Sequence, residues 1–136
     1  MRHATTVKIQ AAYTEHVRTA AVDFDGTLDH GTWPDGFRID QRAVSVLRRF
    51  RARGGRVILW TVRCGEPLAQ AVGALRDAGL RVDAVNENLP DSAPWMRENI
   101  ATGPSPKIYA DVYIDDRGTL DGRVDWDAWA QRLGVR

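Results

Sequence analysis

Short apolar runs alternate along this chain with longer segments in which apolar residues recur every three or four positions. The short runs are typical of buried strands, and the longer segments of amphipathic helices. Strands are predicted at 20–22, 56–61, 82–85 and 110–114, and helices at 40–53, 67–79, 94–100 and 125–133. Asp40 and Asp125 stand at N-cap positions, and glycines end the first two helices.

Strands that alternate with helices predict a parallel sheet joined by right-handed crossovers. We therefore expect a Rossmann-like α/β fold, a three-layer sandwich around a central, mostly parallel sheet. The chain has 136 residues, which fits one domain with one core, and we place that domain at 19–136. Residues 1–18 fit the pattern poorly, and an edge strand, a disordered arm and an upstream start all remain open for them.

Composition narrows the function classes. The chain carries 19 basic and 18 acidic residues, a net charge of +1, which argues against nonspecific nucleic-acid binding. Its apolar runs fall short of the roughly 20 residues of a membrane span, and its first residues lack a signal-peptide core. The single cysteine, Cys64, cannot form an internal disulfide. We expect a cytoplasmic protein that does not bind membranes.

Chemically suggestive residues follow every predicted strand. Parallel sheets bind ligands beyond the carboxyl ends of their strands, so these residues are expected to meet at one edge. They are Asp23 and Asp25 after the first strand, Thr61 after the second, Asn86 after the third, and Asp115 and Asp116 after the fourth. Carboxylate oxygens of this kind suit Mg²⁺, which binds through one or two carboxylates together with phosphate.

Several of these runs resemble those of the haloacid dehalogenase-like (HAD) hydrolases. Asp23–Thr27, followed by leucine, resembles the first signature of that superfamily, Asp-x-Asp-Gly-Thr-Leu after an apolar strand. Leu59–Arg63, Ile114–Arg117 and the pair Asp125-Trp126 resemble runs of its small bacterial and phage-type members. The resemblance covers about 19–129. It implies a HAD-like catalytic domain with a hairpin flap after the first strand and no cap domain, for which the chain has no room.

The resemblance also implies catalytic roles. Asp23 would attack phosphorus and become an aspartyl-phosphate, and Asp25 would protonate the leaving oxygen and then activate water. Thr61 would donate to a phosphoryl oxygen. Lys107 is the candidate for the lysine that neutralises the nucleophile and the phosphoryl group. It lies eight residues before Asp115, and a strand of about 16 Å intervenes, so its loop must double back.

The remaining assignments follow the same resemblance. Asp23 would bind Mg²⁺ through its side chain and Asp25 through its backbone carbonyl, with Asp116 as a direct ligand and Asp115 acting through water. Contacts to the substrate are assigned to Gly26, Thr27, Arg63 and Asn86. If Lys107 does not supply the positive charge, Arg97 or Arg63 would have to do so.

The leading hypothesis is a Mg²⁺-dependent phosphomonoester hydrolase that acts on a small phosphorylated substrate. Transfer of the phosphoryl group to another alcohol, through the same intermediate on Asp23, is one alternative. A Mg²⁺-binding regulatory module without turnover is another. Because a capless site needs another way to exclude water, we expect either a homo-oligomer that covers the site or an open site that takes a bulky substrate.

Overall fold

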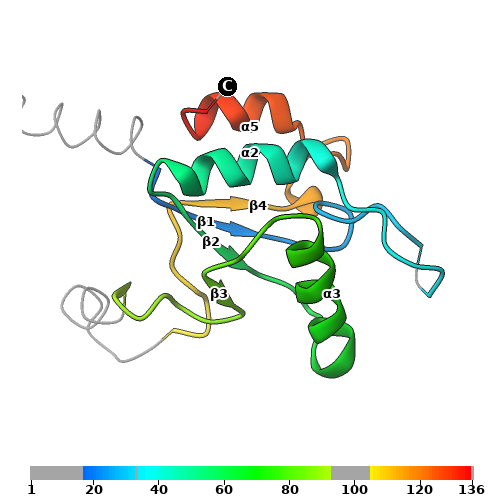
Figure 1. The fold of residues 1–136 in the computed structure, drawn as a ribbon. Helices are drawn as coiled ribbons and strands as arrows, with labels where there is room; N and C mark the ends of the chain where they lie inside the picture. The colour runs from blue at the N-terminus through cyan, green and yellow to red at the C-terminus, as the bar shows by residue number, and fades with distance from the viewer. Residues whose placement is uncertain (1–16, 33, 93–104, 136) are drawn as a thin grey trace, which may run out of the picture.

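The computed structural model of the protein describes residues 17–32, 34–92 and 105–135. Four parallel strands form one sheet in the order β3-β2-β1-β4, with helices packed against it (Figure 1). The elements are β1 (Thr19–Val22), α2 (Gln41–Ala52), β2 (Arg56–Leu59), α3 (Gly65–Asp77), β3 (Ala84–Val85), β4 (Val112–Ile114), the 3₁₀ turn η1 (Asp116–Gly118) and α5 (Trp126–Arg132). The predicted α/β fold with a parallel central sheet is confirmed, and the described part of the β1–α2 connection holds no cap domain.

The register of the sheet brings the strand ends together. Val22, the last residue of β1, lies opposite Leu59 at the end of β2 and Ile114 at the end of β4. Pairing continues one residue further, because the Asp23 N–H donates to the Ile114 carbonyl at 2.9 Å. The residues that follow these strands therefore start from the same edge of the sheet, as Figure 1 shows by the common direction of the arrows.

One face of the sheet carries the main core and all three described α-helices. Alternate strand residues such as Val22 and Leu59 point to this face and are fully buried against α2, α3 and α5. The predicted apolar face of α2 is confirmed, since Val44, Val46, Leu47 and Phe50 are all buried. Asp40 caps the helix by accepting from the Ala43 N–H at 3.0 Å, which satisfies one of its free donors.

The opposite face is covered by a smaller apolar cluster. Ala21 and Ile58 pack there against Leu89, Ile108 and Ala110, which belong to the connections that follow β3 and precede β4. The short helix predicted at 94–100 lies outside the described residues. In the part of the chain that the structure describes, the layer on this face therefore consists of connecting segments.

The described chain enters the core earlier than the predicted domain boundary. Val17, which we placed in the N-terminal extension, is fully buried in the main core. The backbone N–H groups of Arg18 and Thr19 both donate to the Asp111 carboxylate, at 2.8 and 2.9 Å. Residues 17 and 18 thus belong to the folded domain, and the rest of the predicted extension, 1–16, lies outside the described residues.

The connection between β1 and α2 folds back on itself as the predicted flap, which we define as residues 29–39. Asp29 and Ile39 form an antiparallel bridge, and the His30 N–H donates to the Arg38 carbonyl at 2.9 Å. Trp33, within the flap segment, lies outside the described residues. Among the described helices, none combines the length and the apolarity that a membrane crossing requires.

Candidate functional site

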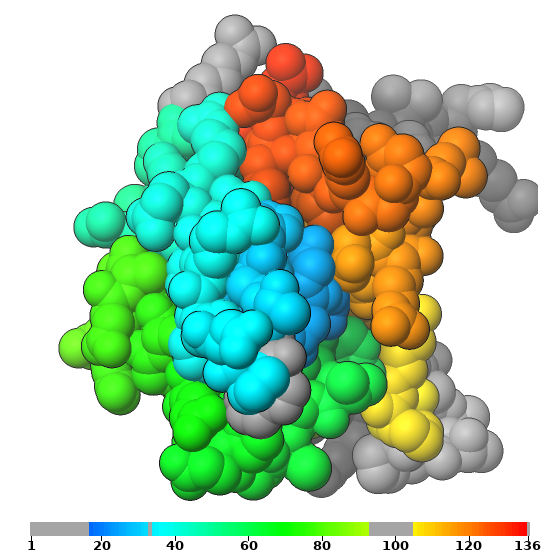
Figure 2. All heavy atoms as spheres, turned by 90° about the vertical axis from the view of Figure 1, so that its right-hand side faces the viewer, coloured from blue at the N-terminus to red at the C-terminus, as the bar shows by residue number. Residues whose placement is uncertain are grey.

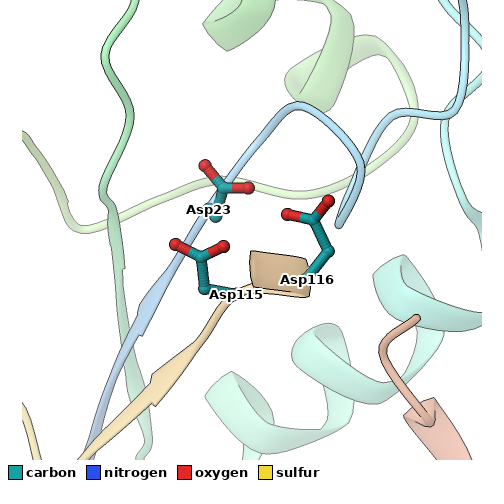
Figure 3. A group of neighbouring side chains, drawn as sticks. All are labelled: Asp23, Asp115 and Asp116. Atoms are coloured by element: carbon teal, nitrogen blue, oxygen red, sulfur yellow. The ribbon is translucent and has the colours of Figure 1, made fainter. Parts of the chain in front are cut away.

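Three carboxylates converge at the carboxyl edge of the sheet. Asp23, Asp115 and Asp116 each offer an oxygen, and these oxygens lie within 4.8 Å of one another (Figure 3). Asp23 directly follows β1, whereas Asp115 and Asp116 follow β4, where Asp115 caps η1 by accepting from the Arg117 N–H at 2.9 Å. The structure thus brings together acids that are about ninety positions apart in the chain.

Thr27 links the two halves of this cluster. Its buried hydroxyl accepts from the Asp116 N–H at 3.0 Å and has Asp23 Oδ2 at 3.2 Å as an acceptor for its own proton. Asp116 Oδ1 is a second, longer acceptor at 3.4 Å. The hydroxyl carries one proton, so it serves one carboxylate at a time. In this structure Thr27, assigned to substrate binding from the sequence, contacts the carboxylates themselves.

Gly26 makes the close approach of Asp116 sterically possible. A Cβ at this position would lie 2.3 Å from Asp116 Oδ2. The backbone also has a φ of +84°, which residues other than glycine rarely adopt. Glycine is therefore required both by the backbone conformation and by the neighbouring carboxylate.

The electrostatics of the cluster favour a bound cation. The pKa of Asp23 is raised to about 7, first because the group is partly buried and then because of the negative charge of Asp115 and a hydrogen bond with Asp116. A hard divalent cation would offset this repulsion, and three carboxylates without nitrogen or sulfur donors suit Mg²⁺. The donor set of Asp23, Asp115 and Asp116 therefore fits the predicted metal, and the assignment of Asp23 and Asp116 as its direct ligands stays a prediction.

Asp25 lies outside this cluster of three carboxylates. Its two oxygens accept from Arg63, at 2.8 Å from Nε and 2.8 Å from Nη2. The Asp25 side chain is 50 % exposed, whereas that of Arg63 is only 10 % exposed. The structure therefore gives Arg63 a carboxylate partner within the protein, and ligation of Mg²⁺ by the Asp25 carbonyl stays a prediction.

The loops after β2 and β3 are tied together at the same edge. The Thr61 N–H donates to Asn86 Oδ1 at 2.8 Å, and Asn86 Nδ2 donates to the Arg63 carbonyl at 3.4 Å. The Thr61 hydroxyl accepts from the Arg63 N–H at 3.2 Å. Asn86 has a φ of +54°, which ends β3 and turns its amide toward the neighbouring loop. Asn86 thus positions the Thr61 loop.

Lys107 contacts groups that do not belong to the acidic cluster. Its ammonium lies 4.8 Å from the centroid of the Tyr113 ring, and its backbone N–H donates to Ser105 Oγ at 3.1 Å. Within the described residues, no ion pair joins Lys107 to Asp23, and the alternative cation Arg97 lies outside them. The role of Lys107 at the phosphoryl group therefore stays a prediction.

The sequence did not indicate that Asp29 helps to shape the site. This side chain is 4 % exposed, and its Oδ1 accepts from the Arg38 N–H at 2.6 Å, which fastens the flap. Phe37, at the end of the flap, packs edge-on against Phe24 with ring centroids 5.7 Å apart. Asp29 opens a run of turn-forming residues, so its burial left little signal in the sequence.

The site opens onto a surface with exposed apolar residues. Figure 2 views the molecule from the side at which the strands end, with the cyan flap at its centre, the green β2–α3 segment below it and the orange segment after β4 above and to its right. Phe37, Val62 and Leu120 lie on these three segments and are exposed. This rim is compatible with both earlier expectations, an oligomer over the site and a bulky substrate.

Comparison with known proteins gives one informative match. No protein-family model matches the chain, and no curated protein matches it. Among solved structures, a conserved protein from Bacteroides thetaiotaomicron superposes with a TM-score of 0.70 and 33 % sequence identity, over 88 % of this chain and 91 % of that one. Identity at this level over nearly the whole of both molecules shows that this chain belongs to the same family as that conserved bacterial protein.

Proposed function

We propose that the protein is a Mg²⁺-dependent phosphomonoester hydrolase of the HAD superfamily that acts through an aspartyl-phosphate on Asp23. The observation that carries the proposal is the convergence of Asp23, Asp115 and Asp116 within 4.8 Å at the carboxyl edge of a parallel sheet. The motif resemblance adds the order of the residues, with Asp-x-Asp-Gly-Thr after the first strand and the acidic pair after the last.

In the first step, a carboxylate oxygen of Asp23 attacks phosphorus and the bond from phosphorus to the leaving oxygen breaks. Asp25 gives a proton to that leaving oxygen. In the second step, a water oxygen attacks the phosphorus of the aspartyl-phosphate and Asp25 takes a proton from this water. Inorganic phosphate leaves and the Asp23 carboxylate is restored, so one water is consumed for each ester cleaved.

The surrounding groups stabilise the transferring phosphoryl group. The Thr61 hydroxyl accepts a hydrogen bond from Arg63 N–H and keeps its own proton to donate to a phosphoryl oxygen. Asp23 and Asp116 would hold Mg²⁺, whose positive charge would stabilise the negative charge on the phosphoryl oxygens.

The decisive experiment is a screen of phosphorylated metabolites and generic phosphate esters, with detection of inorganic phosphate, with and without Mg²⁺. We expect Mg²⁺-dependent release from at least one ester and none from the Asp23→Asn variant. Phosphate appearing on an added alcohol would favour the phosphotransferase alternative. Cation binding without turnover of any ester, or full activity in Asp23→Asn, would overturn the proposal.

A further inference from the structure

Arg63 is held in place by several contacts besides those with Asp25. Besides the two bonds to Asp25, its Nη1 donates to the Pro67 carbonyl at 3.2 Å. Its guanidinium carbon lies 4.9 Å from the centroid of the Phe24 ring and 5.6 Å from that of Phe37. Both rings offer a face that attracts a cation, and with 10 % of its side chain exposed Arg63 has little freedom to move.

The charges around Arg63 keep it in place. Its pKa is raised, chiefly by the hydrogen bonds to Asp25, and the negative charges of Asp25 and Asp29 add to this effect. Asp29 is itself buried and bonded to the flap backbone. A largely covered, permanent cation with this many contacts is well placed to hold a neighbouring carboxylate.

Asp25 is the more exposed partner in this pair. It lies on a loop, half of its side chain is exposed, and within the described chain its carboxylate hydrogen bonds are those from Arg63. A short side chain in that setting would otherwise exchange between rotamers. The two-point contact fixes both carboxylate oxygens and therefore the plane of the group.

We propose that Arg63 positions Asp25, the carboxylate that acts as acid and base. The two hydrogen bonds from its largely covered guanidinium group fix where the oxygens of Asp25 lie relative to the leaving group. The inference rests on the proposed function and goes beyond it, because it assigns Arg63 to the reaction through Asp25 rather than through a contact with the phosphoryl group. A group that delivers a proton must lie within hydrogen-bond reach of the leaving oxygen, so small displacements are costly.

The test compares two substrates that differ in their need for a proton. An alkyl phosphate has a strongly basic leaving oxygen, whereas a dinitrophenyl phosphate leaves readily as the anion. We expect Arg63→Gln and Arg63→Lys to slow the first step, measured as release of the leaving group in a single turnover, about 10–100-fold for the alkyl ester and less than about threefold for the dinitrophenyl ester. Lysine keeps the charge but cannot form the two-point contact, so it should not rescue the alkyl reaction.

A matched control is the surface pair of Arg42 and Asp127. Arg42 Nε lies 2.8 Å from Asp127 Oδ1, and both side chains are largely exposed. Arg42→Gln removes the same kind of group at an unrelated place and should leave both reactions unchanged. Far-ultraviolet circular dichroism and thermal melts establish that each variant is folded, and Arg63→Lys, which keeps the charge, serves if Arg63→Gln does not fold.

A double-mutant cycle completes the test. If Arg63 acts through Asp25, the Asp25→Asn/Arg63→Gln variant should be no slower on the alkyl ester than Asp25→Asn alone. Equal losses of the single-turnover rate on both esters, a raised KM with an unchanged single-turnover rate, or multiplicative losses in the double variant would overturn the positioning role while leaving the proposed hydrolase function intact. Wild-type protein that cleaves neither ester would instead overturn the proposed function, and this inference with it.

Discussion

Two arginine–aspartate pairs with nearly the same hydrogen-bond geometry differ in which side chain is the less exposed. Arg51 donates to both oxygens of Asp83, at 2.8 and 3.0 Å, and Arg63 donates to both oxygens of Asp25, at 2.8 Å. In the first pair the aspartate is the less exposed, 20 % against 33 % for the arginine. In the second pair the order is reversed, with the aspartate 50 % exposed and the arginine 10 %.

This difference separates a structural pair from one that presents a carboxylate. Asp83 Oδ2 also accepts from the Val57 N–H at 2.7 Å, and the Asp83 N–H donates to the Val57 carbonyl at 2.7 Å. The Asp83 carboxylate therefore ties β2 to the segment before β3. Asp25 instead keeps half of its surface open at the carboxyl edge, where a substrate would lie. The less exposed member of each pair is the anchor, and in the second pair the exposed member, Asp25, is left open to a substrate.

The largest expected effect is at the nucleophile. Asp23→Asn should abolish phosphate release, because an amide cannot form the covalent intermediate, and should leave the fold intact. It removes a charge that the site destabilises, so without Mg²⁺ the variant should melt no lower than the wild type at about pH 8. Phosphate release and a thermal melt on the same sample check both statements. Retained activity would contradict the nucleophile assignment.

The comparison of the two pairs predicts opposite outcomes for matched substitutions. Asp25→Asn should lower kcat about 10²–10⁴-fold and change the free energy of unfolding by less than about 1 kcal/mol. Asp83→Asn should leave kcat within about twofold and cost about 2–3 kcal/mol of stability, since it weakens a partly buried pair and a backbone hydrogen bond. Urea denaturation together with steady-state rates distinguishes them. The same pattern of losses in both variants would break the comparison.

Gly26→Ala should weaken cation binding while the hydrophobic core stays intact. The added methyl group would meet Asp116 Oδ2 and disfavour the positive φ, so the carboxylate must shift. We expect a loss of about 1–2 kcal/mol in stability and roughly tenfold weaker Mg²⁺ binding by calorimetry. Gly54→Ala is the control, because that residue also has a positive φ, +101°, but open space around its Cβ position. Equal Mg²⁺ affinity in the two variants would show that Asp116 is not a ligand.

A more gradual effect is expected in the pH dependence of stability. The pKa of Asp23 rises from 3.8 to about 7 in the folded protein, so the folded state binds this proton more tightly than the unfolded state. The resulting stabilisation is complete below about pH 4 and is lost as the pH rises to about 7. Mg²⁺ competes with the proton and should raise the melting temperature more at about pH 8 than at about pH 5. A Mg²⁺ effect that does not depend on pH would contradict this.

The pKa of Asp83 shifts in the other direction. Burial raises it, but the hydrogen bonds from Arg51 and from the Val57 N–H, with the charges of Arg51 and Arg56, bring it below 3.8. This aspartate therefore stabilises the fold above about pH 4, and the contribution is lost as the pH falls through its lowered pKa. Acid melts of Asp83→Asn should show a flatter decline below pH 4 than those of the wild type.

The convergence of the site acids followed from the sequence because it depends on topology alone. Once alternating strands and helices predict a parallel sheet, the residues after each strand must share an edge, and Asp23, Asp115 and Asp116 do so. The N-cap at Asp40 and the buried face of α2 were equally accessible, since both depend on local spacing.

Side-chain choices at that edge were not accessible from the sequence. Asp25 and Arg63 are 38 positions apart, and only the tertiary structure decides that they form a two-point pair. The last three strands are shorter than predicted for a similar reason. Asp83 and Asp111, both expected within strands, instead accept from the backbone of Val57 and of Arg18 and Thr19 through their side chains.

The short connection between β1 and α2 has a kinetic consequence. In its described residues it forms a flap fastened by Asp29, without an inserted domain that could open and shut over the acids. Slow lid movements often limit the turnover of enzymes that have them. Under the proposed hydrolase function, kcat should therefore be insensitive to solvent viscosity and set by bond cleavage rather than by the rate at which a lid releases the product.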